Sequence, residues 1–429
     1  MSTDDCPRYE HIDDVERLDY YKGGGYHPIQ IGHRFRERYR IVHKLGHGSY
    51  STTWLARDEQ LSKYVAVKIG TASSNYKEVD VLNRLSNHLA RENRLCRATI
   101  PCVFDRFDLD GPNGTHPCFV TTPAMCSLAD TIMAGNYKPF QTNVARSIAA
   151  QLATAVAFMH RAGFVHGDLH FGNILLQMPA GIIDDLTNQQ LYDRYDPPEP
   201  EPVVREDGQP IIPSQGVPSH VYALIWMGKP NNDISLAESK LLLADFGTAF
   251  CPDEEPRLSS YTPLEIRPPE ARFEPTKPLS FASDVWSLGC MIWAILGVKP
   301  LLGAWLFGPD SATAAQIDAL GPMPDTWWER WESKTKIESF DGNGAPKPGR
   351  GAWTLERRFE DSMQQPRIEG GMEPIAEDER KAIFDMIRGM LKFSPCHRIS
   401  AHHVLETKWM RKWAIPEVEK SWETKFALL

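Results

Sequence analysis

The chain of 429 residues has little that would place it in a membrane, in a secretory pathway or around a structural metal. Its longest apolar run, Val285 to Val298, is shorter than the roughly 20 residues that a membrane-spanning helix needs. The first residues, MSTDDCPRYE, are polar and acidic, so we expect no signal peptide. These absences predict a protein of the cytoplasm, the nucleus or both, without membrane contact.

The cysteines form no C-x-x-C pair and no spacing with histidine that is typical of a zinc site. We therefore expect reduced, mostly buried thiols, because free cysteine behaves as a small hydrophobic residue. The eight positions are Cys6, Cys96, Cys102, Cys118, Cys126, Cys251, Cys290 and Cys396.

An excess of basic residues is missing too, since 47 Lys and Arg stand against 56 Asp and Glu and the net charge is −9. Binding to nucleic acid needs a basic face, so no direct contact with nucleic acid is expected. Arg34, Arg36, Arg38 and Arg40 alternate with other residues, Phe35 and Tyr39 among them. This alternation favours a half-exposed strand over a nucleic-acid-binding patch.

With 42% hydrophobic residues the chain can bury a large core, and at roughly 150 residues per domain it could form two or three units. Strand patterns dominate residues 1–125, and helical patterns dominate the residues that follow. Prolines and acidic residues are frequent in residues 178–240. We expect this segment to be an insertion that packs partly on the surface.

Residues 39–69 predict a strand, a Gly-rich turn and a second strand. A helix is expected next, because Val79, Leu82, Leu85 and Leu89 recur at spacings of three and four around Glu78. Longer helices are expected at Val144–His160, Val285–Gly297 and Glu377–Lys392.

The Gly-rich turn contains Gly46 and Gly48, with Ser51 where a third glycine would complete the pattern. Glycines let backbone N–H groups approach phosphate oxygens, but a G-x-G pair alone is a weak signal. Lys68 lies on the next predicted strand, where a lysine can hold phosphate groups. Taken alone, Lys68 could equally be a solvent-exposed lysine at a strand edge.

The most specific motif is HGDLHFGN at residues 166–173, followed after the insertion by Asp245-Phe246-Gly247. Phosphoryl transfer needs an aspartate that accepts the proton of the acceptor hydroxyl, together with amide and carboxylate oxygens that hold Mg²⁺. Asp168 or Asn173 alone could simply cap a turn. Their occurrence in the required order, with Lys68 before them, makes coincidence a poor explanation.

The sequence resembles the eukaryotic protein kinases, and more narrowly the SR-protein kinase (SRPK-like) family in its fungal form. The specific signs are YYKGGGYHPIQIG at residues 20–32 and RYRIVHKLGHGSYSTTWLA at residues 38–56. The resemblance covers residues 20–410. It implies an α+β, bilobal protein-kinase-like fold with a small β-rich N-lobe and a larger α-helical C-lobe.

The resemblance also implies a division of the chain. Residues 1–38 would be a leader that packs on the N-lobe, residues 39–124 the N-lobe, and residues 125–410 the C-lobe. The insertion at 178–240 and a C-terminal tail at 411–429 complete this division. The family interrupts its kinase core at the same place, between the catalytic loop and Asp-Phe-Gly.

Carried over residue by residue, the resemblance makes Asp168 the catalytic base, and Lys68 the phosphate-binding lysine that pairs with Glu78. Glu92 is a weaker alternative partner. Asn173 and Asp245 would hold Mg²⁺. The implied ATP-binding residues are Leu45, Gly46, His47, Gly48, Ser49, Tyr50, Ser51, Thr52, Thr53, Ala66, Lys68, Thr121, Thr122 and Ala124.

Further residues would build the substrate lobe. Pro268-Pro269-Glu270 stands where protein kinases carry A-P-E, and Arg398 is the expected partner of Glu270, because a buried carboxylate without one is costly. Arg267 would shape the pocket that follows the phosphorylated residue. Asp284 begins the D-V-W-S-L-G segment, which opens a buried helix.

Two departures from the common kinase pattern affect the expected activity. His170 stands where protein kinases usually carry a lysine that contacts the transferred phosphate, so a fixed charge is replaced by a titratable one. If its charge aids catalysis, kcat should fall as pH rises through the range in which histidine titrates. Gly167 replaces the Arg of H-R-D, which implies weak dependence on phosphorylation of the activation loop. Ser259, Ser260, Tyr261 and Thr262 still offer acceptor hydroxyls in that segment, so regulation there stays an open alternative.

The resemblance predicts a monomeric serine/threonine protein kinase that uses ATP and Mg²⁺ on Arg/Ser-rich, splicing-type proteins. A pseudokinase that serves as a nucleotide-binding scaffold is an alternative, suggested by His170 and by Thr53. A small-molecule phosphotransferase is another, because H-G-D-L-H-x-G-N also resembles aminoglycoside and choline kinases. The Pro-Pro-Glu segment argues against the last.

Overall fold

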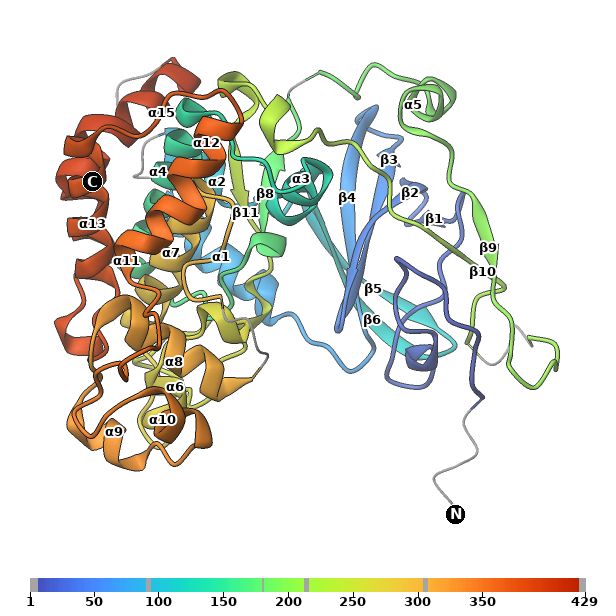
Figure 1. The fold of residues 1–429 in the computed structure, drawn as a ribbon. Helices are drawn as coiled ribbons and strands as arrows, with labels where there is room; N and C mark the ends of the chain where they lie inside the picture. The colour runs from blue at the N-terminus through green and yellow to red at the C-terminus, as the bar shows by residue number, and fades with distance from the viewer. Residues whose placement is uncertain (1–6, 90–93, 180, 212–215, 304–307, 424–429) are drawn as a thin grey trace. The chain divides into compact units, whose positions relative to one another are not determined.

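The computed structural model describes residues 7–89, 94–179, 181–211, 216–303 and 308–423. The chain divides into two compact units. Unit 1 comprises Met1–Ser86, Pro101–Cys126 and Gln177–Met227, and unit 2 comprises Asn87–Ile100, Ser127–Leu176 and Gly228–Leu429. Unit 1 is built on a β-sheet and unit 2 mainly on helices (Figure 1), so the α+β class predicted from the sequence is confirmed.

Unit 1 contains a six-stranded antiparallel sheet with the strand order β1-β2-β3-β4-β6-β5. Neighbours in sequence are mostly neighbours in the sheet, because tight hairpins connect them. The strands are β1 (Arg34–Phe35), β2 (Tyr39–Gly48), β3 (Ser51–Asp58), β4 (Lys63–Gly70), β5 (Asp105–Gly111) and β6 (Gly114–Thr121).

Each face of this sheet has its own apolar cluster, because successive side chains of a strand point to opposite faces. One face carries Trp54, Val67 and Val120, against which Ile29 of the leader packs. The other face carries Val42, Leu55 and Tyr64, together with Ile183, Leu191, Ile225 and Met227 of the predicted insertion.

The insertion is therefore a packed part of unit 1 through Met227. It forms α5 (Asn188–Tyr195) and a small antiparallel ladder of β9 (Pro200–Pro202) and β10 (His220–Tyr222). In the VYALIW segment Val221 and Ile225 are buried, while Leu224 and Trp226 are exposed. The expectation of partial packing thus describes this segment, but the local helix was not foreseen.

The arginines at residues 34–40 do not lie on one continuous strand. Arg36 and Glu37 have positive φ angles of 52° and 50°, so they form the turn between β1 and β2, and the predicted strand is wrong at this point. The guanidinium groups pair with acids of other strands, Arg36 with Asp105 of β5 at 3.2 Å and Arg38 with Asp58 of β3 at 2.7 Å.

Unit 2 is organised around α4 (Thr142–Arg161) and α7 (Phe281–Leu296), whose side chains are buried on most faces. Both were predicted from their continuous apolar sequence. The other helices are α2 (Arg94–Thr99), α3 (Leu128–Ala134), α6 (Glu270–Phe273), α8 (Pro309–Leu320), α9 (Asp325–Arg330), α10 (Lys334–Ser339), α11 (Leu355–Phe359), α12 (Gln365–Glu369), α13 (Glu377–Met390), α14 (Ala401–Glu406) and α15 (Ile415–Trp422).

Shorter elements complete the fold. Along the chain, helix α1 (Lys77–Leu89) begins in unit 1 and ends in unit 2. The chain passes from unit 1 to unit 2 again within β7 (Ala124–Ser127). Unit 2 has the strands β8 (Ile174–Gln177) and β11 (Leu241–Leu243). Single turns are η1 (Leu18–Tyr20), η2 (Phe171–Asn173), η4 (Asn231–Asp233), η5 (Leu236–Glu238), η6 (Phe246–Thr248), η7 (Leu264–Ile266), η8 (Glu360–Gln364), η9 (Pro395–His397) and η10 (Met410–Ala414).

The C-terminal segment packs on unit 2 through α15. Trp422 is 6% exposed, and its Nε1 donates to Oε1 of Gln151 on α4 at 3.2 Å. Within the described residues, no helix combines the length and the apolar character needed to cross a membrane.

Candidate active site

The Gly-rich segment forms the hairpin between β2 and β3 in unit 1. Gly48 pairs with Ser51, so Ser49 and Tyr50 make a two-residue turn at its tip. The pairing register shifts between Lys44 and Gly46, which bends the end of β2. Residues His47 to Tyr50 are exposed, so their backbone amides are accessible to a ligand.

Lys68 and Glu78 form an ion pair in the same unit. Nζ of Lys68 on β4 lies 2.7 Å from Oε2 of Glu78, which is in the first turn of α1. Both side chains are largely buried, at 21% and 14% exposure, so the pair is shielded from solvent more than a surface pair. Glu92, the alternative partner, lies outside the described residues.

The other residues predicted to bind nucleotide lie on the neighbouring strands. Thr53 on β3 pairs with Lys68 on β4, and Ala66 on β4 pairs with Thr121 at the end of β6. Thr122 and Ala124 follow β6 directly. The sheet register thus brings together side chains that are more than 50 residues apart in the sequence.

In unit 2 a short ladder joins the two halves of the catalytic motif. Ile174 of β8 pairs with Leu243 of β11, and the backbone N–H of Ala244 donates to the carbonyl of Asn173 at 2.8 Å. Asn173, just before β8, and Asp245, just after β11, therefore lie at the same end of this ladder. Residues separated by the whole insertion are brought to one place by backbone pairing.

Asp168 has an acceptor atom that no described group satisfies. Its Oδ1 is buried and has no hydrogen-bond partner within the described residues, while its backbone carbonyl accepts from Nδ2 of Asn173 at 2.9 Å. A buried carboxylate oxygen without a donor is costly in free energy. This oxygen is suited to accept a hydrogen bond from a hydroxyl that enters the site.

Asp284, at the start of α7, fixes the backbone of the catalytic loop. Its carboxylate accepts from the backbone N–H groups of His166 at 2.7 Å and Gly167 at 3.0 Å, and lies 3.0 Å from Nε2 of His160. Burial by itself would raise the pKa of Asp284, but the hydrogen bond and charge of His160, the charge of His166 and the Gly167 amide outweigh it and lower the pKa.

Gly167 occupies a position that suits glycine. Its φ angle is +77°, a region that glycine enters at no steric cost but other residues do not. A Cβ atom at Gly167 would lie 3.3 Å from the carbonyl oxygen of Thr248. The glycine that replaces Arg in this motif therefore removes backbone strain as well as a positive charge.

His170 faces Asp168 and also caps the following turn. Its Nδ1 accepts from the backbone N–H of Gly172 at 3.1 Å, and its Nε2 lies 3.7 Å from Oδ2 of Asp168. While Nδ1 accepts this bond, a ring proton can sit only on Nε2, the nitrogen that faces Asp168. The charge that His170 was predicted to bring to catalysis stays a prediction.

The residues present fit a magnesium ion that also binds phosphate oxygens. Asn173 and Asp245 provide amide and carboxylate oxygens, which are ligands that Mg²⁺ prefers when it keeps waters and phosphates in its shell. Asp245 adopts φ +59°, a conformation that Asp tolerates better than most residues. Within the described residues, no cluster of three or more His, Cys, Asp and Glu side chains is arranged to hold a metal by itself.

Thr262 connects the segment before Pro268 to the catalytic loop. Its hydroxyl donates to the carbonyl of Gly167 at 3.4 Å, and its own carbonyl accepts from Nε of Arg267 at 2.9 Å. Thr262 is 3% exposed, whereas Tyr261 is 56% exposed. The sequence placed Thr262 only among hydroxyls open to modification, and no local pattern distinguishes it from its neighbours.

Glu270 and Arg398 form the expected ion pair inside unit 2. Two guanidinium nitrogens of Arg398 contact the two carboxylate oxygens at 2.7 and 2.6 Å. Arg398 also donates to the carbonyls of Ala282, Lys392 and Phe393. These contacts satisfy both buried charges, so the pair fixes α6 against the helices near the C-terminus.

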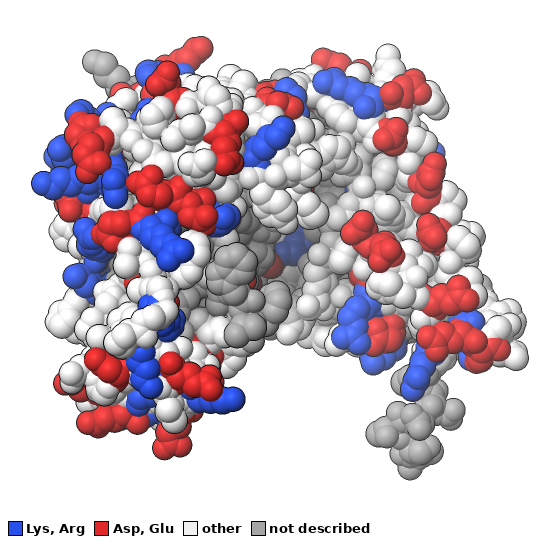
Figure 2. Space-filling view, in the orientation of Figure 1, with Lys and Arg blue, Asp and Glu red and all other residues white. Residues whose placement is uncertain are grey.

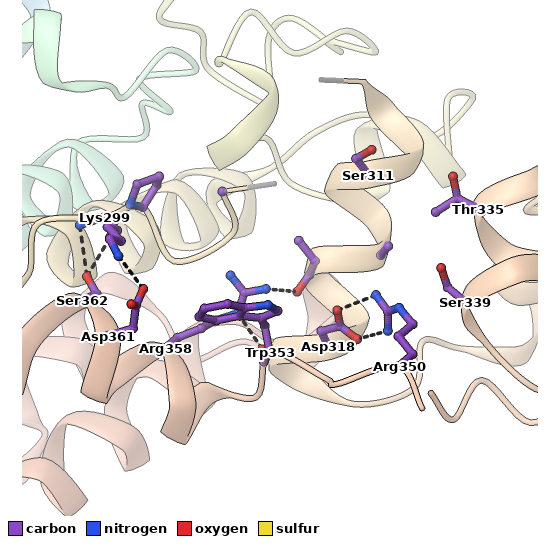
Figure 3. A pocket seen from close by; sticks show the side chains of 14 residues that line it. Lys299, Ser311, Asp318, Thr335, Ser339, Arg350, Trp353, Arg358, Asp361 and Ser362 are labelled. Atoms are coloured by element: carbon purple, nitrogen blue, oxygen red, sulfur yellow. Dashed lines mark hydrogen bonds and ion pairs between the residues drawn. The ribbon is translucent and has the colours of Figure 1, made fainter. Parts of the chain in front are cut away.

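Unit 2 also contains a cavity of about 390 Å³ away from the catalytic motif (Figure 3). Its acidic side chains are each paired with a basic one, Asp318 with Arg350 at 2.6 Å and Asp361 with Lys299 at 2.8 Å. Trp353 lies beside Arg358 in this cavity. Charges of both signs are likewise interspersed on the face of the protein drawn in Figure 2.

Comparison with known proteins adds independent information. A model described as the protein kinase domain matches residues 39–185 and 228–410, which is more than half of the chain. A serine/threonine protein kinase of Aspergillus fumigatus is 26% identical over 408 residues, covering 92% of this chain and 90% of its own length.

Two further relatives bear names of a narrower group. A serine/threonine-protein kinase SRPK of Physarum polycephalum is 26% identical over 416 residues, covering 92% of this chain and 91% of its own. Human SRSF protein kinase 3 is 34% identical over 170 residues, covering 38% of this chain and 30% of its own.

Proposed function

Since this chain belongs to the protein kinase family and is an SRPK-like serine/threonine protein kinase, we propose that its substrates are arginine- and serine-rich proteins of the splicing type. The family, the fold and the enzyme class predicted from the sequence are thereby confirmed. Neither the pseudokinase nor the small-molecule phosphotransferase is favoured. Membership of this family implies the use of ATP on protein substrates.

The observation that carries the substrate proposal is the relationship to kinases named SRPK and SRSF protein kinase. The net charge of −9 is compatible with basic substrates. The proposal places the enzyme in the cytoplasm, the nucleus or both, and takes it to act as a monomer.

We assign the residues of unit 1 to nucleotide binding. In this assignment the amides of the Gly-rich hairpin and Nζ of Lys68 bind phosphate oxygens, and Glu78 orients Lys68 through the 2.7 Å ion pair. In the same assignment Thr121, the last residue of β6, stands at the back of the adenine pocket, and the backbone of residues Thr122 to Ala124 pairs with the base. The ion pair supports the assignment, because a lysine held on one side by a carboxylate keeps its remaining N–H groups in a defined direction.

We assign the chemical step to unit 2. Asp168 accepts the hydroxyl proton at Oδ1 while the serine oxygen bonds to the γ-phosphorus, and the bond from that phosphorus to the oxygen shared with the β-phosphate breaks. Asn173 and Asp245 would hold Mg²⁺, which would supply positive charge to the phosphates. The unpaired Oδ1 of Asp168 supports this assignment.

The direct test is phosphate transfer with ATP and Mg²⁺ to an Arg/Ser-repeat protein and, in parallel, to a neutral serine-containing protein. Asp168→Ala is the control and should lower kcat by roughly 10²- to 10⁴-fold. We expect a clear preference for the Arg/Ser-repeat protein. Equal transfer to both proteins would refute the substrate class, and nucleotide binding without transfer would make the chain a pseudokinase.

A further inference from the structure

The leader contains a tight turn that ends at Tyr26. The backbone N–H of Tyr26 donates to the carbonyl of Tyr20 at 3.0 Å, and that of Gly25 donates to Lys22 at 2.8 Å. A Cβ atom at Gly25 would lie 1.7 Å from the carbonyl oxygen of Tyr20. Only glycine fits there, so the chain is closed into one defined conformation.

Tyr26 directs its hydroxyl at the Gly-rich hairpin. The residue is 3% exposed, and its ring packs against those of Tyr20 and Tyr21, with centroids 6.1 and 5.5 Å away. Its Oη donates to the carbonyl of Gly48 at 2.8 Å. Burial raises the pKa of Tyr26 to about 12, so the hydroxyl remains a donor under any ordinary assay condition.

This hydrogen bond sets the direction of an amide in the hairpin. In a trans peptide the C=O and the following N–H point in opposite directions, and no cis peptide occurs in the described residues. Fixing the carbonyl of Gly48 towards the leader therefore aims the N–H of Ser49 away from it. A Gly-rich loop binds phosphate through such N–H groups.

The same turn also holds the tip of the hairpin through a second segment. The carbonyl of Tyr50 accepts from the backbone N–H of Thr71 at 2.9 Å and from the hydroxyl of Ser74 at 3.2 Å. The N–H groups of Ala72 and Ser73 in turn donate to the carbonyls of Gly25 and Gly24, both at 2.9 Å.

Residues 71–74 lead into α1, which carries Glu78. Gly48, which closes the hairpin turn, bonds directly to this part of the leader, and Tyr50 at the tip and the start of α1 are connected to it through residues 71–74. Asn113 anchors that turn from the opposite side, because its Nδ2 donates to the carbonyl of Tyr26 at 2.6 Å and its own carbonyl accepts from the N–H of Gly24 at 2.9 Å.

We propose that Tyr26 is a positioning residue for phosphoryl transfer, which holds the Gly48 peptide so that the hairpin amides face the nucleotide phosphates. The inference rests on the proposed role of the hairpin in nucleotide binding. Gly48 is exposed, so water can satisfy its carbonyl when the tyrosine hydroxyl is removed. The loss should therefore affect the orientation of the loop and hardly the stability of the fold.

Tyr26→Phe in the full-length chain tests this, with Tyr21→Phe as the matched control. The hydroxyl of Tyr21 belongs to the same leader and is also buried, but it bonds to Glu16 and not to the hairpin. For each variant we would measure ADP and adenosine affinity, KM for ATP, KM for the protein substrate, kcat and the melting temperature.

We expect Tyr26→Phe to weaken ADP binding and to raise KM for ATP by about three- to tenfold, the effect of one lost hydrogen bond. Adenosine affinity and KM for the protein substrate should not change, because neither depends on the phosphate-binding amides. The ratio of ADP to adenosine affinity should be unchanged in Tyr21→Phe.

An unchanged ratio of ADP to adenosine affinity in Tyr26→Phe would overturn the proposal, whether both affinities stay the same or both fall equally. The binding ratio does not depend on which protein is phosphorylated. If the chain does not prefer Arg/Ser-rich proteins, the expected change in the ADP to adenosine ratio still holds. A failure of the substrate proposal can therefore be told apart from a failure of the proposal for Tyr26.

Discussion

The buried charge of Asp284, at the start of α7, is stabilised by donors that converge on it, two of them from the catalytic loop. Asp284 is 2% exposed, and an unpaired carboxylate there would be strongly destabilising. Two backbone amides and His160 donate to it. The loop that carries Asp168 is thus tied to α7, the most apolar helix of unit 2, so its geometry is set before any substrate binds.

We predict that His170 takes part in the chemical step as a hydrogen-bond donor. Its Nδ1 is occupied as an acceptor for the Gly172 N–H, so we expect it to donate through Nε2. His170→Ala should lower kcat by at least about tenfold, because one donor to the transferred phosphate is lost. His170→Lys, which supplies a donor again, should retain most of the activity.

The pH dependence separates the neutral role from a charged one. If only the N–H at Nε2 matters, the kcat ratio of the parent to His170→Lys should be the same at low and at high pH. A ratio that falls as the pH rises would instead show that the protonated ring aids catalysis. If His170→Ala keeps the kcat of the parent, His170 takes no part in the chemical step.

Among the elements, the leader and strand β2 are joined by a fully buried ion pair. Nζ of Lys44 bonds to Oε2 of Glu16, and the two side chains are 0% and 1% exposed. Burial would raise the pKa of Glu16, but the charge and hydrogen bond of Lys44 hold it below its usual value. The leader is therefore part of the fold of unit 1.

We predict that Lys44→Met lowers the free energy of unfolding by about 3–5 kcal/mol, because it leaves the Glu16 carboxylate buried without its partner. The double variant Glu16→Leu with Lys44→Met should recover most of this loss, since no isolated charge remains. Urea unfolding of both variants and the parent measures the difference. A double variant as unstable as the single one would mean that packing around Lys44, and not its charge, matters.

At the scale of the whole molecule, stability should depend on pH through buried histidines of unit 1, His27 and His43 above all. His27 and His43 are 8% and 4% exposed, and burial lowers the pKa of each to about 4. The pKa of an unfolded histidine is near 6.5. Between these values the unfolded chain binds protons that the folded chain does not, so stability falls as pH falls from about 6.5 to about 4.

The expected loss is roughly 2 kcal/mol per histidine between pH 7 and pH 5, as an upper bound. Urea unfolding at the two pH values measures it, and hydrogen exchange should locate the weakening in unit 1. His43→Gln should reduce the pH dependence, because glutamine does not titrate. The same pH dependence in this variant would assign the effect to other groups.

The amino-acid sequence by itself determined the chemistry and the family. Asp168, Asn173 and Asp245 lie in short motifs whose order is visible along the chain, and the family resemblance that these motifs carry implied the α+β class. The candidate catalytic residues could be named from the sequence because each lies in a short local motif. Their assigned roles stay predictions until the variants are measured.

Only the tertiary structure decided the contacts between distant segments. The Tyr26 hydroxyl meets Gly48, Asn113 donates to Gly216 at 2.8 Å, and Ile225 of the insertion donates to Lys44 at 2.9 Å. The turn at Arg36 replaced a predicted strand for the same reason. Such contacts depend on which faces of the sheet remain to be covered, and that is fixed by packing and not by any local pattern.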